Sequence, residues 1–142
     1  MGLDAAVWPN KNRVDLGSDR QFAKMDPDTG QLHFEDAELE KKHWPKLRPL
    51  LEHRIGNIWS VAELREEAIR LLGAESRIVL QVLYSGSHSG DFIPVGELPG
   101  FVREVGAIRK TGRGSQEMSE FLSKFEELIQ TATREGNPIV FT

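Results

Sequence analysis

Residues 85–91 contain the densest set of reactive side chains in the chain. Hydroxyl, imidazole and carboxylate groups are interleaved there with Gly86 and Gly90. Such groups suit proton transfer, metal ligation or, where glycines let backbone N–H groups converge, anion binding. Loops held by a rigid element often carry function, so this segment is the main candidate site. The candidate binding residues are Tyr84, Ser85, Ser87, His88, Ser89 and Asp91.

Each specific chemistry meets an objection in the sequence itself. A phosphate-binding loop normally leads into a helix, but Phe92-Ile93-Pro94 follows here and does not readily start one. A nucleophile elbow needs serine between its glycines, and His88 stands at that position. His88 and Asp91 are two metal ligands without a third. A turn with side chains bonded to backbone is therefore the favoured interpretation, followed by a protein contact and then by chemistry.

A second, weaker candidate is a group of three basic residues before Ser115, the expected start of a helix. A helix N-terminus with nearby cations can hold a phosphate or a carboxylate. Cations are also typical of the end of a preceding helix followed by a mobile linker, and this ordinary interpretation is favoured. The candidate anion-binding residues are Arg109, Lys110 and Arg113.

The other polar and aromatic residues give weaker signals. The four histidines lack the spacing of a zinc-binding helix, so we expect no metal site, with His43 and His53 on the solvent side. The mixed charges of residues 35–42 are typical of a solvated helix face, or else of an acidic patch that meets a basic partner. Tryptophans are expected in the core, and an exposed one would be a candidate interface anchor. The three are Trp8, Trp44 and Trp59.

Several strands are expected to position these residues. The apolar run Arg77–Tyr84 predicts a strand that is buried on both faces at the centre of a sheet and presents the 85–91 loop at its end. The turn residues of Asp26–Gly30 predict a β-hairpin. Shorter strands are expected over 3–8, 13–16, 21–25, 92–95 and 139–141.

Apolar residues at spacings of three and four predict four helices. The first has its apolar face from Trp44 to Ile58, with Pro49 delaying its start or kinking it. The second begins at Ser60, which forms a capping box with Glu63. The third covers 98–108 and the fourth begins at 115, with a flexible linker over 109–114.

The composition limits the class of protein. With 142 residues, 39% of them hydrophobic and 28% charged, the chain can build the core of one domain over 1–142. Its net charge of −4 is unlike the basic footprint of a nucleic-acid-binding protein. The chain has no cysteine, no signal-peptide pattern and no apolar run that spans a bilayer. We therefore expect a cytoplasmic protein with no cofactor, no nucleic-acid partner and no membrane partner.

Three segments of the chain share their pattern with other proteins: Met1–Asp4, Tyr84–Pro94 and Asn137–Phe141. They resemble a group of small, mostly uncharacterised bacterial proteins, some of which are associated with immunity proteins of polymorphic toxin systems. The resemblance covers both ends and the central loop, and the helices between them are generic. It implies a cytoplasmic single-domain protein that acts by binding another protein, and it assigns no catalytic residue.

These observations predict an α+β fold, with a small mixed or antiparallel sheet and about four helices packed mainly on one face. The favoured function is non-enzymatic binding of another protein, as in a toxin-neutralising immunity protein. The alternative is a small hydrolase, or an anion- or metal-binding enzyme, that uses the Ser85–Asp91 loop. The sequence leaves the partner and the oligomeric state open.

Overall fold

The central sheet joins the two ends of the chain. Its strands are β1 (Gly2–Val7), β4 (Leu51–Asn57), β5 (Phe92–Ile93) and β6 (Ile139–Phe141). In the computed structural model, which describes residues 1–142, they lie in the order β4-β1-β6-β5. Every neighbouring pair is antiparallel. The predicted α+β fold is confirmed.

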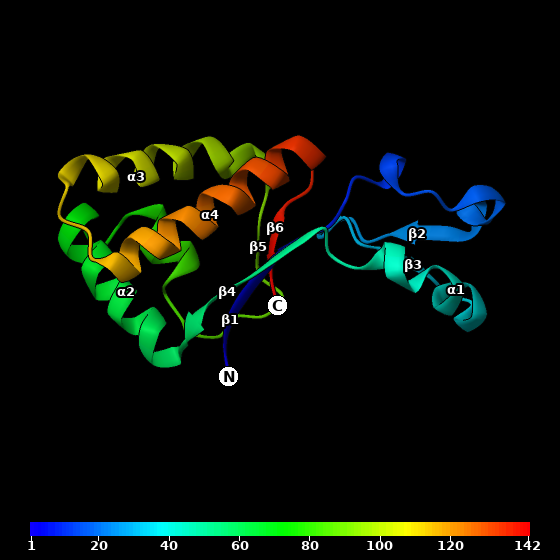
Figure 1. Ribbon diagram of the computed structural model, residues 1–142, viewed down its shortest axis with the longest axis horizontal. Helices are drawn as coiled ribbons and strands as arrows, with labels where there is room; N and C mark the ends of the chain where they lie inside the picture. The colour runs from blue at the N-terminus through cyan, green and yellow to red at the C-terminus, as the bar shows by residue number, and fades with distance from the viewer.

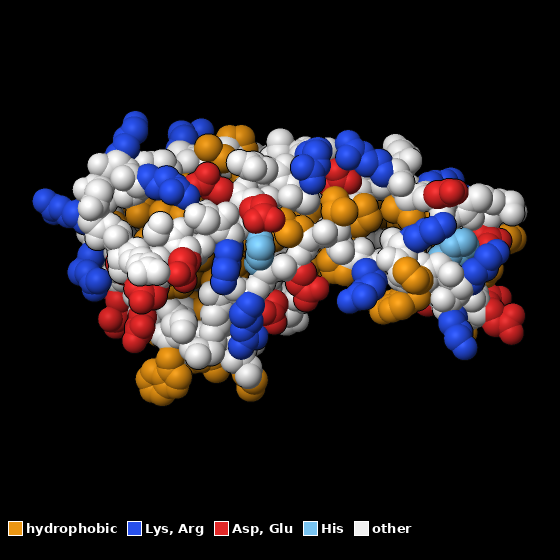
Figure 2. Space-filling model, viewed as in Figure 1, with side chains coloured by type: hydrophobic (Ala, Val, Ile, Leu, Met, Phe, Trp, Pro, Cys, Tyr) orange, Lys and Arg blue, Asp and Glu red, His pale blue; other side chains and the backbone are white.

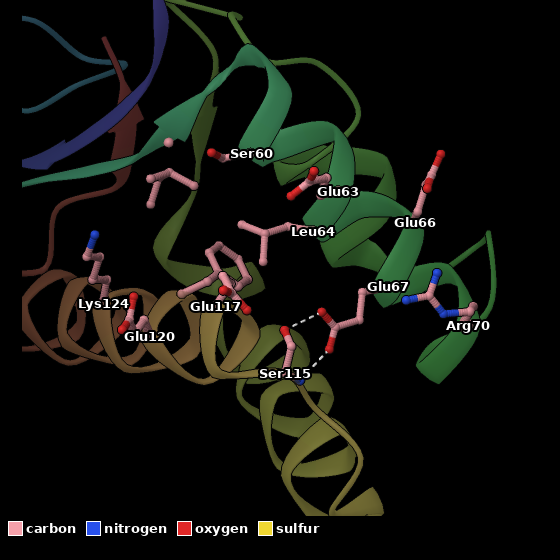
Figure 3. A pocket seen from close by; sticks show the side chains of 13 residues that line it. Ser60, Glu63, Leu64, Glu66, Glu67, Arg70, Ser115, Glu117, Glu120 and Lys124 are labelled. Atoms are coloured by element: carbon pink, nitrogen blue, oxygen red, sulfur yellow. Dashed lines mark hydrogen bonds between the residues drawn. The ribbon is translucent and has the colours of Figure 1, made fainter.

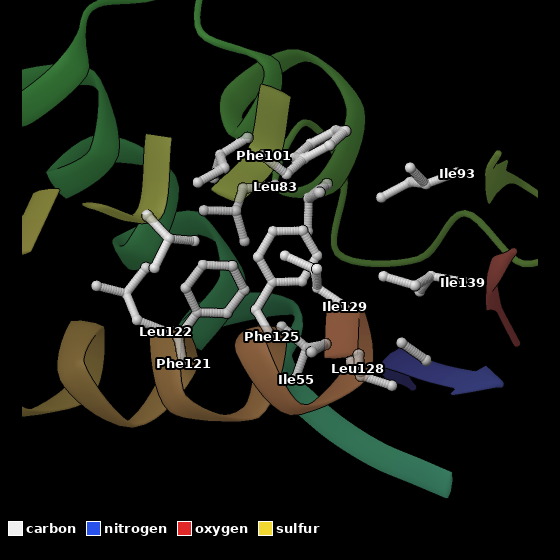
Figure 4. Close-up of a cluster of buried hydrophobic side chains, with 14 of the residues drawn as sticks. Ile55, Leu83, Ile93, Phe101, Phe121, Leu122, Phe125, Leu128, Ile129 and Ile139 are labelled. Atoms are coloured by element: carbon white, nitrogen blue, oxygen red, sulfur yellow. The ribbon is translucent and has the colours of Figure 1, made fainter. Parts of the chain in front are cut away.

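Three helices cover one face of this sheet (Figure 1). They are α2 (Ile58–Leu72), α3 (Leu98–Thr111) and α4 (Gln116–Glu135). Together with the sheet they enclose a core of 25 buried residues. In this core the rings of Phe101 and Phe125 meet edge-on with their centroids 5.6 Å apart, and the rings of Phe121 and Phe125 stack with their centroids 5.5 Å apart (Figure 4). None of the helices has both the length and the apolar character needed to cross a membrane.

Residues 8–50 form an inserted segment between the paired strands β1 and β4. It extends away from the three helices (Figure 1) and contains β2 (Ala23–Met25), β3 (Leu32–Phe34), α1 (Ala37–Leu47) and 3₁₀ turns at Lys11–Arg13 and Gly17–Phe22. The predicted hairpin is confirmed, since β2 pairs with β3 and the Asp26 side chain accepts the Asp28 N–H at 2.8 Å. A second core of five buried residues fills the segment: Val14, Leu16, Leu32, Phe34 and Leu47.

The prediction of a central strand over Arg77–Tyr84 is wrong. Residues 78–82 form one wide helical turn of the π type, closed by a 2.9 Å hydrogen bond from Leu83 N to the Ile78 carbonyl. A continuous apolar run without alternation suits a buried helical turn as well as a buried strand. Glu104 of α3 favours the helical turn here, because its carboxylate accepts the Arg77 and Ile78 N–H groups at 2.8 and 2.9 Å. The centre of the sheet is formed by β1 and β6 instead.

The helix expected from Trp44 to Ile58 is also wrong. Helix α1 ends at Leu47, and β4 follows after Pro49. A residue before proline is pushed to extended backbone, and Arg48 adopts φ −75° and ψ 159°. The apolar residues that share a helical spacing therefore belong partly to the end of α1 and partly to one face of β4.

Smaller differences concern the ends of elements. Helix α2 begins at Ile58 and is capped by Asn57, whose side chain accepts the Ser60 N–H at 2.8 Å, so Ser60 is not the cap. Arg109 and Lys110 belong to the last turn of α3, and the linker begins only at Gly112. The strand expected over 13–16 is absent, and the strand expected over 21–25 is reduced to β2.

Candidate functional site

The 85–91 loop is held at both ends by backbone contacts. At one end, Gly90 N donates to the Phe141 carbonyl at 2.8 Å, and Phe141 N donates to the Asp91 carbonyl at 2.9 Å. At the other end, Gly86 lies against the start of α2, where a β-carbon would come within 2.8 Å of Ile58 Cα. The loop therefore fills the space between β6 and α2.

His88 points into the protein from this loop. Its side chain is 5% exposed, and the centroid of its ring lies 4.5 Å from that of Tyr84 and 4.4 Å from that of Phe141. Its Nε2 donates to the Val82 carbonyl at 2.8 Å, and its Nδ1 lies 3.3 Å from an Asp91 carboxylate oxygen. Both ring nitrogens thus face groups of the protein itself, and the buried Nδ1 makes no hydrogen bond there.

Tyr84 and Asp91 form the outer part of this cluster. The Tyr84 hydroxyl donates to the Asp91 carboxylate. Burial raises the pKa of Tyr84 to about 12, with contributions from the hydrogen bond to Asp91 and from its negative charge. Both residues remain partly exposed to solvent. The loop therefore presents a fixed phenol–carboxylate pair at the surface.

Ser85 is the serine whose side chain stabilises the backbone of the loop. Ser85 Oγ donates to the Ser87 carbonyl at 3.0 Å and accepts the Ser87 N–H at 3.3 Å, and no serine hydroxyl bonds to the His88 ring. Ser87 and Ser89 are exposed. This pattern is that of a turn with side chain–backbone bonds, which the sequence analysis favours.

The three predicted anion-binding cations have different surroundings. Arg109 pairs with Glu126 at 2.5 Å, while Lys110 and Arg113 are exposed on the surface. A carboxylate of the protein occupies that helix terminus instead, because Glu67 of α2 accepts the Ser115 N–H at 2.6 Å and the Ser115 hydroxyl at 2.5 Å (Figure 3). The N-terminus of α4 therefore does bind a carboxylate, but this carboxylate belongs to Glu67 of the same chain.

A groove that the sequence did not predict lies between α2 and α4 and has a volume of about 370 Å³. Its floor includes Ile55, Leu64 and Phe121, and its walls are mainly acidic (Figure 3). The acidic residues are spaced by three and four on α2 and by three on α4, and this spacing was the available signal for a shared face. The glutamates that line it are Glu63, Glu66, Glu67, Glu117 and Glu120, and its basic residues are Arg70 and Lys124.

Trp59 lies next to this groove and is 81% exposed. It precedes Glu63 by four residues and Glu66 by seven, so the three side chains share one face of α2. Its neighbour Ile58 is also exposed. Figure 2 shows an apolar group protruding below a cluster of acidic side chains on the helical part of the molecule.

The other two tryptophans lie away from the groove, in the inserted segment. Trp8 is buried, and its indole N–H donates to the Leu47 carbonyl at 3.1 Å. Trp44 is half exposed on α1. Core packing is thus right for Trp8 alone. Trp44 and Trp59 both meet the condition for a candidate interface anchor, and Trp59 is the more exposed of the two.

The histidines lie apart from one another. His43 is buried against Phe34 and hydrogen-bonded to Asp19 at 2.9 Å, so the prediction that it faces solvent is wrong. His53 is partly buried and lies 3.2 Å from Glu127. No group of three or more histidine or acidic side chains converges in a way that would hold a metal ion.

Comparison of the chain with protein-family models, curated proteins and solved structures gives no match. The resemblance to immunity-associated bacterial proteins therefore stays a prediction. What the site can do rests on the geometry of this chain alone.

Proposed function

We propose that the protein is a non-enzymatic binding protein whose α2/α4 groove receives a basic surface of another protein. The observation that carries the proposal is an indole, Trp59, that is 81% exposed beside carboxylates without partners. Glu63, Glu66 and Glu117 make no hydrogen bond or ion pair within the chain. Such groups are available to a cationic partner without the loss of an internal contact.

The two features have complementary roles in binding. Tryptophan is enriched among residues that dominate the binding energy of interfaces, because a large ring buries about 150–250 Å². Complementary charge speeds encounter and disfavours acidic partners. Trp59 would supply the anchor, and the glutamates of the groove would select and orient the partner.

The biological role that we propose for this binding is the neutralisation of a toxin in the cytoplasm. The resemblance of both chain ends and of the 85–91 loop to immunity-associated proteins favours it. The hydrolase alternative gains no support from the geometry, because the His88 ring is buried and both its nitrogens face protein groups.

A capture experiment with matched variants tests the proposal. The immobilised protein and its Trp59→Ala and Trp44→Ala variants are exposed to a lysate of cells that naturally express the chain, and any retained protein is identified, purified and titrated. We expect a basic partner whose affinity falls at least tenfold with Trp59→Ala, stays unchanged with Trp44→Ala and weakens as salt increases.

Charge variants complete the test. The double variant Glu63→Gln, Glu117→Gln should bind the purified partner more weakly. The variant Glu38→Gln, at an exposed position on α1, should bind it with unchanged affinity. A partner that is acidic, or equal affinity of all variants, would overturn the proposal, and so would the absence of any retained protein.

A further inference from the structure

A second hollow lies on the side of the 85–91 loop where Tyr84 and Asp91 reach the surface. It is open, has a volume of about 370 Å³ and combines aromatic side chains with a single carboxylate. Nothing in the α2/α4 groove contributes to it. Its lining residues are Leu80, Gln81, Tyr84, Gly90, Asp91 and Phe92.

The apolar side chains around the hollow are unusually exposed. Leu80 is 56% exposed, Tyr84 41% and Phe92 39%. One face of the Tyr84 ring stacks on His88, so the exposed part of the ring belongs to the hollow. Apolar groups that line a concave surface can strip water from a ligand that enters it.

Asp91 is fixed within this apolar rim. One of its carboxylate oxygens, Oδ2, accepts the Tyr84 hydroxyl and faces His88 Nδ1. The other, Oδ1, has no hydrogen-bond partner, and the side chain is 54% exposed. The carboxylate is therefore held in one orientation with a free acceptor, which reduces the entropy lost when a ligand binds.

We infer that this hollow binds an organic cation, namely the guanidinium or ammonium end of an arginine or lysine side chain presented by a polypeptide. Aromatic faces attract cations through the negative charge at the centre of the ring. A free carboxylate oxygen accepts a charge-assisted hydrogen bond from the same cation. An anion would be repelled by Asp91, and a neutral apolar group would desolvate that carboxylate without a partner.

The hollow stands independently of the α2/α4 groove, although both favour basic ligands. The two surfaces have no lining residue in common. A ligand of the hollow can therefore be tested with a small probe and without knowledge of the protein partner.

The test is an NMR titration of the full chain with Nα-acetyl-arginine methylamide and with its neutral isostere, Nα-acetyl-citrulline methylamide. We expect saturable shifts of the backbone amides of residues 80–92 with the arginine probe, and at least tenfold weaker binding of the citrulline probe. Equal shifts with the two probes, shifts that map elsewhere, or no shift with the arginine probe would overturn the inference.

Variants separate the contributions of charge and ring. Asp91→Asn should abolish the response to arginine, and Phe92→Leu should weaken it about two- to fivefold. Phe22→Leu, at an exposed aromatic of the inserted segment, should leave it unchanged. Retention of full affinity in Asp91→Asn would also refute the site. Glu63→Gln should have no effect on this titration, so failure of the groove proposal and failure of the hollow give different results.

Discussion

The cluster of Tyr84, His88 and Asp91 contains the residue types of an active site in an arrangement that stabilises a loop. His88 is buried between two rings and hydrogen-bonded to the Val82 carbonyl. Phe141 supplies one of those rings from the far end of the chain. The sequence of residues 84–91 does not predict where Phe141 lies. The burial of His88 therefore follows from the tertiary fold and not from the local sequence.

The single tyrosine of the chain makes this cluster directly measurable. We expect Tyr84 to titrate with a pKa of about 12 by ultraviolet absorbance, against an ordinary value of 10.0 in urea-unfolded protein. Because the folded-state pKa is the higher one, this group's contribution to stability is complete below pH 10 and is lost as the pH rises towards 12.

The matched variant for this titration is Asp91→Asn. It removes the negative charge but leaves the burial of Tyr84, so the pKa should fall while staying above 10.0. A midpoint of 10 in the folded wild-type protein would contradict the Tyr84–Asp91 hydrogen bond and the partial burial of the phenol.

A second titratable contact lies in the inserted segment. Hydrogen bonds from His43 and Lys42 hold the pKa of Asp19 below its ordinary value of 3.8. The carboxylate therefore stabilises the fold above about pH 4, and this contribution is lost as the pH falls through the lowered pKa. We expect Asp19→Asn to lower the melting temperature at pH 5, with a smaller difference at pH 2.5. A difference that does not depend on pH would exclude this ionic contribution.

At the scale of elements, the sequence predicts those whose signals are local. The hairpin at Asp26–Gly30, α3 and the Ser115 cap of α4 follow from turn residues, apolar spacing and a capping hydroxyl. The wide turn after Arg77 does not, because its first N–H groups are bound by Glu104, far along the chain.

In the candidate site too, the features that depend on local sequence could be predicted, and those that depend on tertiary packing could not. The polar loop is recognisable from composition, and its side chain–backbone bonds at Ser85 follow from its serines and glycines. The α2/α4 groove needs the packing of two helices that are distant in sequence, and Trp59 becomes informative only when its exposure is known.

The contact between the loop and α2 gives a prediction at this scale. Gly86→Ala places a β-carbon 2.8 Å from Ile58 Cα, so the loop must shift, and we expect a loss of about 1–3 kcal/mol in the free energy of unfolding. The control is Gly106→Ala on α3, where a β-carbon meets nothing within 4 Å. It should stabilise the protein by up to about 1 kcal/mol through helix propensity. Urea unfolding of both variants measures the difference, and similar changes would contradict the packing of Gly86.

At the scale of the whole molecule, a few polar contacts hold the inserted segment against the helical part. Glu135, at the end of α4, is 1% exposed and accepts hydrogen bonds from Asn10 N at 3.1 Å and from Arg13 at 2.8 Å. Asn137 donates to the Trp8 carbonyl at 2.8 Å. The orientation of the segment therefore depends on residues at the end of α4 and directly after it.

Substitution of Glu135 tests this attachment. Glu135→Ala leaves the Asn10 N–H without its acceptor, and we expect a loss of about 1–3 kcal/mol in the free energy of unfolding by urea. Glu38→Ala, at an exposed position on α1, should change it by less than about 0.5 kcal/mol. Equal effects of the two substitutions would show that Glu135 does not join the two parts.

The distribution of charge over the whole molecule leads to the central claim, that the face around Trp59 and the acidic groove binds a basic protein. The most direct measurement is photo-crosslinking in cells that naturally express the chain, with a photoreactive phenylalanine analogue at the exposed position 62, about one helical turn after Trp59, or, as the control, at position 44. The account predicts a discrete adduct with a basic protein from position 62 alone, which disappears when Glu63 and Glu117 are changed to lysine. Adducts of equal yield from both positions, or no adduct from position 62, would contradict it.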